Sequence, residues 1–305
     1  MSLAISRPVA LALNRGAAVV ALETSVVAQG LPAPHNLRAA KACEAAVKKA
    51  GATPAAVGVL DGEIRVGLSA AELAALAKGG PKLIKAGAGE LAVAIGLKLS
   101  AGTTVSATCE VAARAGIRVF ATGGIGGVHR GVEHSWDVSQ DLQKIAECPV
   151  GVVCAGAKSV LDLPKTLELL ETLGVPVLGV GTREFPGFFT RDTGLKLEHS
   201  VKNAKEAAAV MHARFQLGQG GVILALPPPE ETALPREEVE AEIASALLEA
   251  QEAGVSGKAV TPFLLSTLAK RSGERTLKAN LALLVNNARF AGEVAVEIAK
   301  LRKRG

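Results

Sequence analysis

The apolar positions of this chain come in short runs that are separated by longer segments with helical spacing. The first run, Ala17–Leu22, is rich in β-branched residues and is followed directly by Glu23. Such a run predicts a buried strand whose polar residues emerge at its end. Similar runs, each followed by glycine, proline or a polar residue, cover residues 117–124, 149–158, 175–182 and 220–226. Strands that alternate with helices predict a parallel or mixed sheet covered on both faces.

Local signals refine this outline near the N-terminus. The pair Asp61-Gly62 lies within an alternating apolar and polar stretch and predicts a tight antiparallel hairpin. Residues 37–51 predict an alanine-rich helix, which we expect Asn36 to cap, and Ser69–Ala77 predicts an amphipathic helix. The chain shows no repeat and no linker. We therefore expect a single three-layer αβα domain, residues 1–305, with a mixed, largely parallel sheet.

Composition narrows the class of ligand. With 305 residues, 49% of them hydrophobic, the chain can bury a large core. Its net charge of +5 and aromatic content of only 3% suit a small anionic molecule better than a nucleic acid.

The four cysteines lack CxxC spacing, which argues against a disulfide framework and a zinc knuckle. No apolar run reaches the roughly 18 residues of a membrane helix, so we expect a soluble, cytoplasmic protein without a membrane partner.

Most of the ionisable groups that could carry chemistry lie between Val119 and Lys158, in a glycine-rich segment. His129 and His134 have an HxxxxH spacing, which is a weak zinc signal, and hydrogen bonding within the loop is an equally simple role for them. Asp137 alone would suffice to hold a hard divalent ion, such as magnesium or manganese, that keeps most of its waters.

Lys158 follows the apolar run at residues 149–157, and two readings of it are equally well supported. A lysine at the end of a buried strand can lose part of its hydration, which frees the amine for attack on an aldehyde. It can also be an ordinary ammonium that binds phosphate or forms an ion pair. Position alone does not separate a Schiff-base nucleophile from an anion-binding lysine.

Several other polar residues have both a functional and a structural reading. Glu23 is a candidate acid or base, although a strand-end glutamate is more often a cap or a surface acid. Lys85 could aim an ammonium at a ligand. Thr104 lies in a segment, TTVSA, that precedes an apolar helix, so it could bind an anion or simply cap that helix. Asn286 and Asn287 interrupt an apolar helix and could face a polar ligand or neighbouring helices.

Taken together, these motifs resemble the pseudouridine-5'-phosphate glycosidase family, also called indigoidine synthase A-like. The resemblance extends over nearly the whole chain and rests on collinear motifs. These are ALETSVVAQGLPAPHN, VGVLDGEIRVGL, FATGGIGGVHRG with the downstream DVSQDL, VVCAGAKSVLDLPKTLELLETLGVPVLG, GTREFPGFFTRDTG, and TPFLL with NNARFAGEVA.

The resemblance implies reversible cleavage of the C–C glycosidic bond of pseudouridine 5'-phosphate to uracil and ribose 5-phosphate. It also implies one divalent metal per subunit, usually manganese, a three-layer αβα fold and, commonly, a homotrimer. Carried onto matching positions, it makes Lys158 the nucleophile, Glu23 the proton donor and Asp137 the metal ligand. The implied substrate contacts are Lys85, Val105 through its backbone, Ser139, Gln140 and Asp141.

The implied reaction explains why a lysine is needed. A C-glycoside has no oxygen or nitrogen leaving group, so paired carboxylates suit it poorly. A Schiff base between Lys158 and C1' of the opened sugar would supply an electron sink, and Glu23 would move the protons. Two alternatives stay open: a Schiff-base aldolase or lyase for another sugar phosphate, and a non-catalytic phosphometabolite-binding protein in which Lys158 and Lys85 only hold anions.

Overall fold

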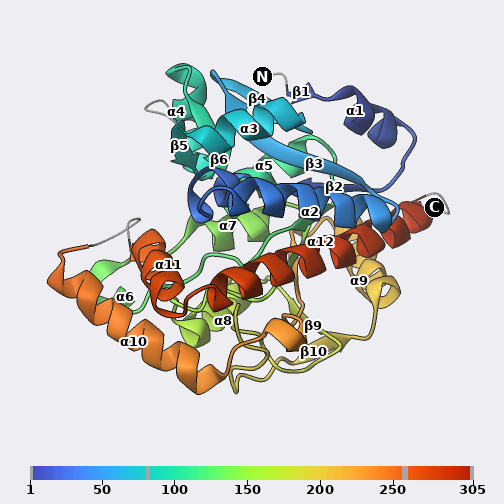
Figure 1. Cartoon of the computed structure of the whole chain (residues 1–305). Coiled ribbons are helices and arrows are strands. Elements are labelled where there is room, and N and C mark those ends of the chain that lie inside the picture. The colour runs from blue at the N-terminus through green and yellow to red at the C-terminus, as the bar shows by residue number, and fades with distance from the viewer. Residues whose placement is uncertain (1–2, 80–82, 256–259, 303–305) are drawn as a thin grey trace.

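The computed structural model describes residues 3–79, 83–255 and 260–302, in which helices surround a central twisted sheet (Figure 1). The strands are β1 (Ala4–Ile5), β2 (Val19–Leu22), β3 (Thr53–Leu60), β4 (Glu63–Val66), β5 (Leu83–Ala86), β6 (Ser100–Thr103), β7 (Val119–Ala121), β8 (Gly151–Cys154), β9 (Val177–Val180), β10 (His199–Val201) and β11 (Val222–Ala225).

The helices connect these strands and cover the sheet. They are α1 (Arg7–Asn14), α2 (His35–Lys49), α3 (Ala70–Lys78), α4 (Ala88–Gly96), α5 (Val105–Arg114), α6 (Val132–Ser135), α7 (Gln140–Glu147), α8 (Leu163–Thr172), α9 (Ala204–Gln216), α10 (Arg236–Glu252), α11 (Val260–Arg271) and α12 (Arg275–Arg302), with a π-helical turn η1 (Val26–Gly30) and a 3-10 turn η2 (Glu230–Thr232).

The sheet is mixed and mostly parallel, as the sequence predicts. Its order is β1-β4-β3-β2-β7-β8-β11-β9-β10, with β6 paired to β3 and β5 paired to β6. The eight-residue strand β3 joins two parts of the sheet. Its first half, Thr53–Ala56, pairs in parallel with β2, whereas its second half, Val57–Leu60, pairs antiparallel with β4 through the hairpin at Asp61-Gly62. The predicted hairpin is therefore confirmed.

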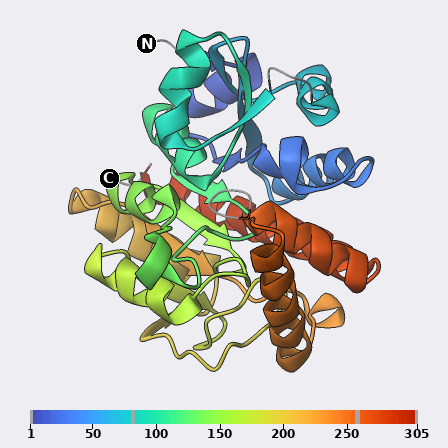
Figure 2. The ribbon, with the colours of Figure 1, turned by 90° about the vertical axis from the view of Figure 1, so that its left-hand side faces the viewer.

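Helices cover both faces of the parallel part of the sheet, which confirms the expected αβα layering. Helix α12 contacts α2 and α9, and it crosses β2, β7 and β8. Helices α5, α7 and α8 cover the other face (Figures 1 and 2). Among the described residues no helix is both long and apolar enough to cross a membrane.

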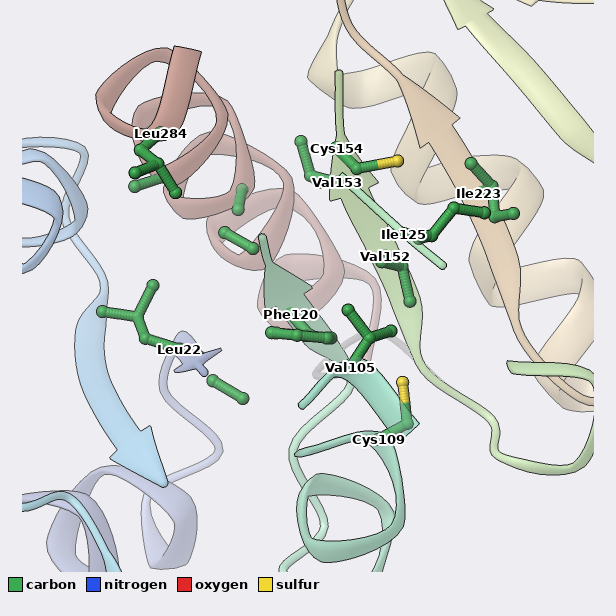
Figure 3. Packing of buried hydrophobic residues seen from close by; sticks show 14 of the residues in the cluster. Leu22, Val105, Cys109, Phe120, Ile125, Val152, Val153, Cys154, Ile223 and Leu284 are labelled. Atoms are coloured by element: carbon green, nitrogen blue, oxygen red, sulfur yellow. The ribbon is translucent and has the colours of Figure 1, made fainter. Parts of the chain in front are cut away.

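The core lies between these layers and is filled by aliphatic side chains and a few phenylalanines. Figure 3 shows Val105 and Cys109 of α5, Phe120 of β7 and Val152 of β8 within it. Phe120 is fully buried, and burial of such a side chain contributes about 1.5–3 kcal/mol. All four cysteines are buried and unpaired.

One predicted helix start is wrong. Asn36 does not cap α2, because the helix already begins at His35 and Pro34 occupies the N-cap position. The Asn36 side chain instead donates hydrogen bonds to Val27 O at 3.0 Å and Ala77 O at 3.4 Å. These carbonyls belong to η1 and α3, so tertiary partners determine the role of this asparagine.

Candidate functional site

The candidate site lies where three neighbouring parallel strands end. Strand β2 pairs in parallel with β7, and Leu22 is opposite Ala121, so the residues that follow, Glu23 and Thr122, leave the sheet side by side. Strand β7 pairs in turn with β8, whose exit leads to Lys158. Ligand sites in open parallel sheets form at the carboxyl ends of strands, where such exits gather.

Glu23 is half-buried directly after β2, and both of its carboxylate oxygens accept hydrogen bonds. The hydroxyl of Ser25 donates to Oε2, and the hydroxyl of Thr122 donates to Oε1. Two hydroxyl donors restrict rotation of the carboxylate. Glu23 is thus a positioned acid rather than the solvated surface glutamate that its place in the sequence also allowed.

Lys158 lies four residues beyond the end of β8 and is half-buried. Its backbone N–H donates to Ile125 O at 3.0 Å, while Ile125 N–H donates to Gly156 O at 3.1 Å. Gly156 has φ +80°, and a Cβ at this position would lie 1.9 Å from Pro186 O, so only glycine fits. This turn fixes the backbone from which the lysine side chain projects.

His129 and Asp137 face each other beside Lys158. Their backbones are joined by a hydrogen bond of 3.0 Å, and His129 Nδ1 lies 3.8 Å from Asp137 Oδ2. Burial lowers the pKa of His129; Asp137 opposes this shift, and the ammonium groups of Lys158 and Lys85 add to it. Only 16% of the His129 side chain is exposed. His134, by contrast, is exposed on α6.

The carboxylate of Asp137 suits a hydrated hard cation. Among the described residues there is no group of three or more His, Cys, Asp or Glu side chains that could hold a metal. Manganese and magnesium, however, are often bound through one or two carboxylates while keeping several waters. Asp137, with 29% of its side chain exposed, is compatible with such an ion.

Asp141 is buried beneath the glycine-rich loop, and its carboxylate accepts two backbone hydrogen bonds. Ser106 N donates to Oδ1 at 2.8 Å and Gly126 N donates to Oδ2 at 2.8 Å. Ser139 caps α7 by accepting a hydrogen bond from Asp141 N at 3.2 Å. The structure therefore places Ser139 and Asp141 together, with Asp141 joining the loop to the start of α5.

The first turns of α4, α5 and α7 meet next to this junction. Gly89 N, in α4, donates to Gln140 Oε1 at 3.1 Å, and Ala88 N donates to Ser106 Oγ at 3.2 Å. Thr104 is the N-cap residue of α5, but its side chain makes no capping hydrogen bond and lies 3.1 Å from Ser106 Oγ. Helix N-termini favour anions, so this region suits a phosphate.

Two further predicted contacts belong to this region. Val105 is the buried first residue of α5, directly after Thr104. Lys85 lies on β5, which is parallel to β6, and its side chain is exposed. Strand β6 ends at Thr103, so Lys85, Thr104 and Val105 approach the same edge of the sheet.

The two asparagines of α12 have different environments. Asn287 is fully buried, and its Nδ2 donates to Thr122 O at 2.8 Å and to Gly123 O at 3.3 Å. Asn286 is only half-buried and donates to Pro227 O at 3.4 Å. Of the pair, Asn287 contacts the backbone of the site.

Thr122 and Ser25 are site-forming residues that the sequence did not single out, whereas Ser106 stands in the TTVSA segment that it did. Thr122 stands in the motif FATGG, where it looks like part of a flexible glycine turn. The signal that could have identified it is its position directly after a buried strand, like that of Glu23 after β2.

The neighbouring phenylalanines are core residues: Phe188 and Phe189 are buried and pack edge to face, with ring centroids 4.7 Å apart.

Comparison with known proteins gives consistent matches over the full length. A family model described as indigoidine synthase A like protein matches residues 8–297. The pseudouridine-5'-phosphate glycosidase of Myxococcus xanthus (strain DK1622) is 60% identical over 301 residues, which cover 98% of this chain and 99% of that protein. The protein of the same name from Chloroflexus aurantiacus (strain ATCC 29364 / DSM 637 / Y-400-fl) is 50% identical over 303 residues, again covering 98% and 99%.

Two solved structures share the fold. The prealnumycin C-glycosynthase AlnA, determined in complex with ribulose 5-phosphate, has a TM-score of 0.92 and 36% sequence identity, covering 99% of each chain. An indigoidine synthase A-like protein from Thermotoga maritima has a TM-score of 0.88 and 37% identity, covering 97% of each chain.

Proposed function

The chain belongs to the family of indigoidine synthase A-like proteins and pseudouridine-5'-phosphate glycosidases, and on that premise we propose that it reversibly cleaves the C–C glycosidic bond of pseudouridine 5'-phosphate. The products are uracil and ribose 5-phosphate. The observation that carries the proposal is that Glu23 and Lys158 follow β2 and β8, the two strands that flank β7 in the parallel sheet, in a chain that is 60% identical to a glycosidase of that name.

Lys158 supplies the chemistry that a C-glycoside requires. Its amine nitrogen forms a bond to C1' as the ring bond between C1' and O4' opens, and O4' takes a proton. The nitrogen lone pair then forms the C1'=N imine while the C1'–C5 electron pair leaves with uracil, whose C5 is protonated. Water hydrolyses the imine, which releases ribose 5-phosphate and restores the amine.

Glu23 is the acid and base for these proton transfers. Its carboxylate is held at the exit of β2, beside the strand pair that leads to Lys158. In protonated form it can donate to O4' as the ring opens, and as a carboxylate it can accept and relay the proton needed at C5. Positioned general acid–base groups of this kind contribute about 10²–10⁴-fold in rate.

The sugar phosphate is bound where α4, α5 and α7 begin. We expect Lys85 and His129 to contact the sugar phosphate, and Val105 to contribute its backbone N–H at the first turn of α5. Ser139 and Gln140, at the start of α7, complete the contacts, and Asp141 belongs to the same segment. The related AlnA structure contains ribulose 5-phosphate, another five-carbon sugar phosphate, which supports this substrate class.

Asp137 is the proposed ligand of one divalent metal per subunit, with manganese the expected ion. Such a metal, when bound, would organise waters and ligand oxygens near the sugar. The homotrimer implied by the family resemblance also remains a proposal, which light scattering on the purified protein tests directly.

A borohydride-trapping experiment tests the function and separates it from its alternatives. The wild-type protein, incubated with ribose 5-phosphate and reduced, should carry a mass adduct on Lys158, and with added uracil it should form pseudouridine 5'-phosphate. Lys158→Ala should do neither, whereas Lys202→Ala, at an exposed position near β10, should behave as wild type. An adduct without a uracil-dependent product favours an aldolase. No adduct and no product leaves a phosphometabolite-binding protein.

A further inference from the structure

We propose that Thr122 is a positioning residue that fixes the Glu23 carboxylate relative to the strand leading to Lys158, and that Asn287 holds Thr122 in place from α12. The inference rests on the acid–base role proposed above for Glu23. It concerns two buried residues that support the carboxylate.

Strand register brings Thr122 to Glu23. Leu22 is opposite Ala121 in the parallel pair of β2 and β7. The residues that follow, Glu23 and Thr122, therefore lie side by side at the ends of the two strands. Thr122 is 1% exposed, and its hydroxyl donates to Glu23 Oε1. Because the hydroxyl is buried and the carboxylate is half-buried, little water is available to replace the hydroxyl as a hydrogen-bond donor. Loss of this donor therefore leaves Oε1 without a fixed partner.

Two further hydrogen bonds hold the backbone of Thr122. Its N–H donates to Val153 O of β8 at 3.0 Å, and its C=O accepts from Asn287 Nδ2 at 2.8 Å. The hydroxyl of this residue thus bonds to Glu23 at the exit of β2, its N–H to β8 and its C=O to α12. Thr122 links the strand exit that carries the acid to the strand exit that carries the nucleophile.

Asn287 makes this link at a cost. Its side chain is fully buried, and Oδ1 accepts no hydrogen bond from any described residue. An unsatisfied buried acceptor is unfavourable, and the two hydrogen bonds donated by Nδ2 offset part of that cost. Nδ2 reaches both Thr122 O and Gly123 O, which are the two carbonyls at the exit of β7. Helix α12 therefore anchors the turn that orients Glu23.

The test compares variants at residue 122 that keep or lose the hydroxyl. Thr122→Val and Thr122→Ala should lower kcat for pseudouridine 5'-phosphate synthesis by about 100-fold, the loss expected when a reacting group is displaced by about 1 Å. The KM for ribose 5-phosphate and the final yield of borohydride-trapped Lys158 should stay within about twofold of wild type, because these depend on other groups. Thr122→Ser should recover kcat to within about threefold.

The control is Thr172→Val, which changes an exposed threonine whose hydroxyl bonds to Glu168 O within α8, and its kinetics should match wild type. If Thr122→Val is poorly folded, Thr122→Ala is compared with wild type and Thr122→Ser instead. Full kcat in the hydroxyl-free variants overturns the inference, and so does an equal loss in Thr122→Ser, which would mean packing rather than hydrogen bonding. Full activity in Glu23→Gln and Lys158→Ala would instead overturn the proposed function, so the two failures are distinguishable.

Discussion

Asp141 Oδ1 accepts a hydrogen bond of 2.8 Å from the backbone N–H of Ser106, although 35 residues separate the two in sequence. The other carboxylate oxygen accepts from Gly126 N at the same distance. One buried side chain therefore connects the start of α5 to the glycine-rich loop. The expected substrate contact of Asp141 stays a prediction, and the structure adds a positioning role for the same residue.

Asp141→Asn should destabilise the protein. An asparagine offers only one acceptor oxygen, and its amide group would face a backbone N–H, which leaves one buried donor unpaired. The free energy of unfolding should fall by about 1–3 kcal/mol. Urea denaturation measures this value, with the exposed Asp192→Asn as the matched control. Equal midpoints for the two variants would show that the buried carboxylate does not stabilise this junction.

Gly126→Ala should damage the site, whereas Gly96→Ala should not. A Cβ at Gly126 would lie 2.3 Å from Ser139 Oγ and 2.7 Å from Asp141 Oδ2, so the loop must move, at a cost of about 1–3 kcal/mol. A Cβ at Gly96, in the last turn of α4, has no neighbour within 4 Å and should be neutral or stabilising by up to about 1 kcal/mol. Thermal unfolding and synthesis rates of the pair test the difference.

Asp137→Asn should weaken manganese binding. Trp136 is the only tryptophan of the chain, is 85% exposed and precedes Asp137, so its fluorescence should be quenched by the paramagnetic ion. Loss of the carboxylate should raise the dissociation constant by about tenfold or more. Magnesium should compete without quenching, and Asp192→Asn should titrate like wild type. Unchanged quenching in Asp137→Asn would place the metal elsewhere.

Glu72 should make the stability depend on pH in the acid range. The backbone N–H of Ser69 donates to Glu72 Oε2 at 2.7 Å and lowers the pKa of this carboxyl below its ordinary 4.5. Since the folded pKa is depressed, this stabilisation is present above the unfolded pKa of about 4.5 and is lost as the pH falls through the lower folded value. Urea midpoints should therefore fall less steeply below pH 4.5 in Glu72→Gln than in wild type. The exposed Glu252→Gln should follow wild type.

Hydrophobic patterning predicted the alternation of strands and helices because burial requires it. The hairpin at Asp61-Gly62 followed from turn chemistry, since Asp61 and Gly62 both have positive φ. The helix predicted from Ser69 forms as α3 with a complete capping box to Glu72. Boundaries were less exact where tertiary contacts compete, since Asn36 bonds to η1 and α3 instead of capping α2.

Glu23 and Lys158 can be identified as candidate reactive residues from the amino-acid sequence, because they follow buried apolar runs that must become strands. Which residues contact them depends on how the strands pair and the helices pack. The parallel register of β2, β7 and β8 brings Thr122 to Glu23 and carries both toward the exit that leads to Lys158. Partners such as Asn287, 165 residues from Thr122, leave no local pattern, because their hydrogen bonds exist only once the sheet and α12 have packed together.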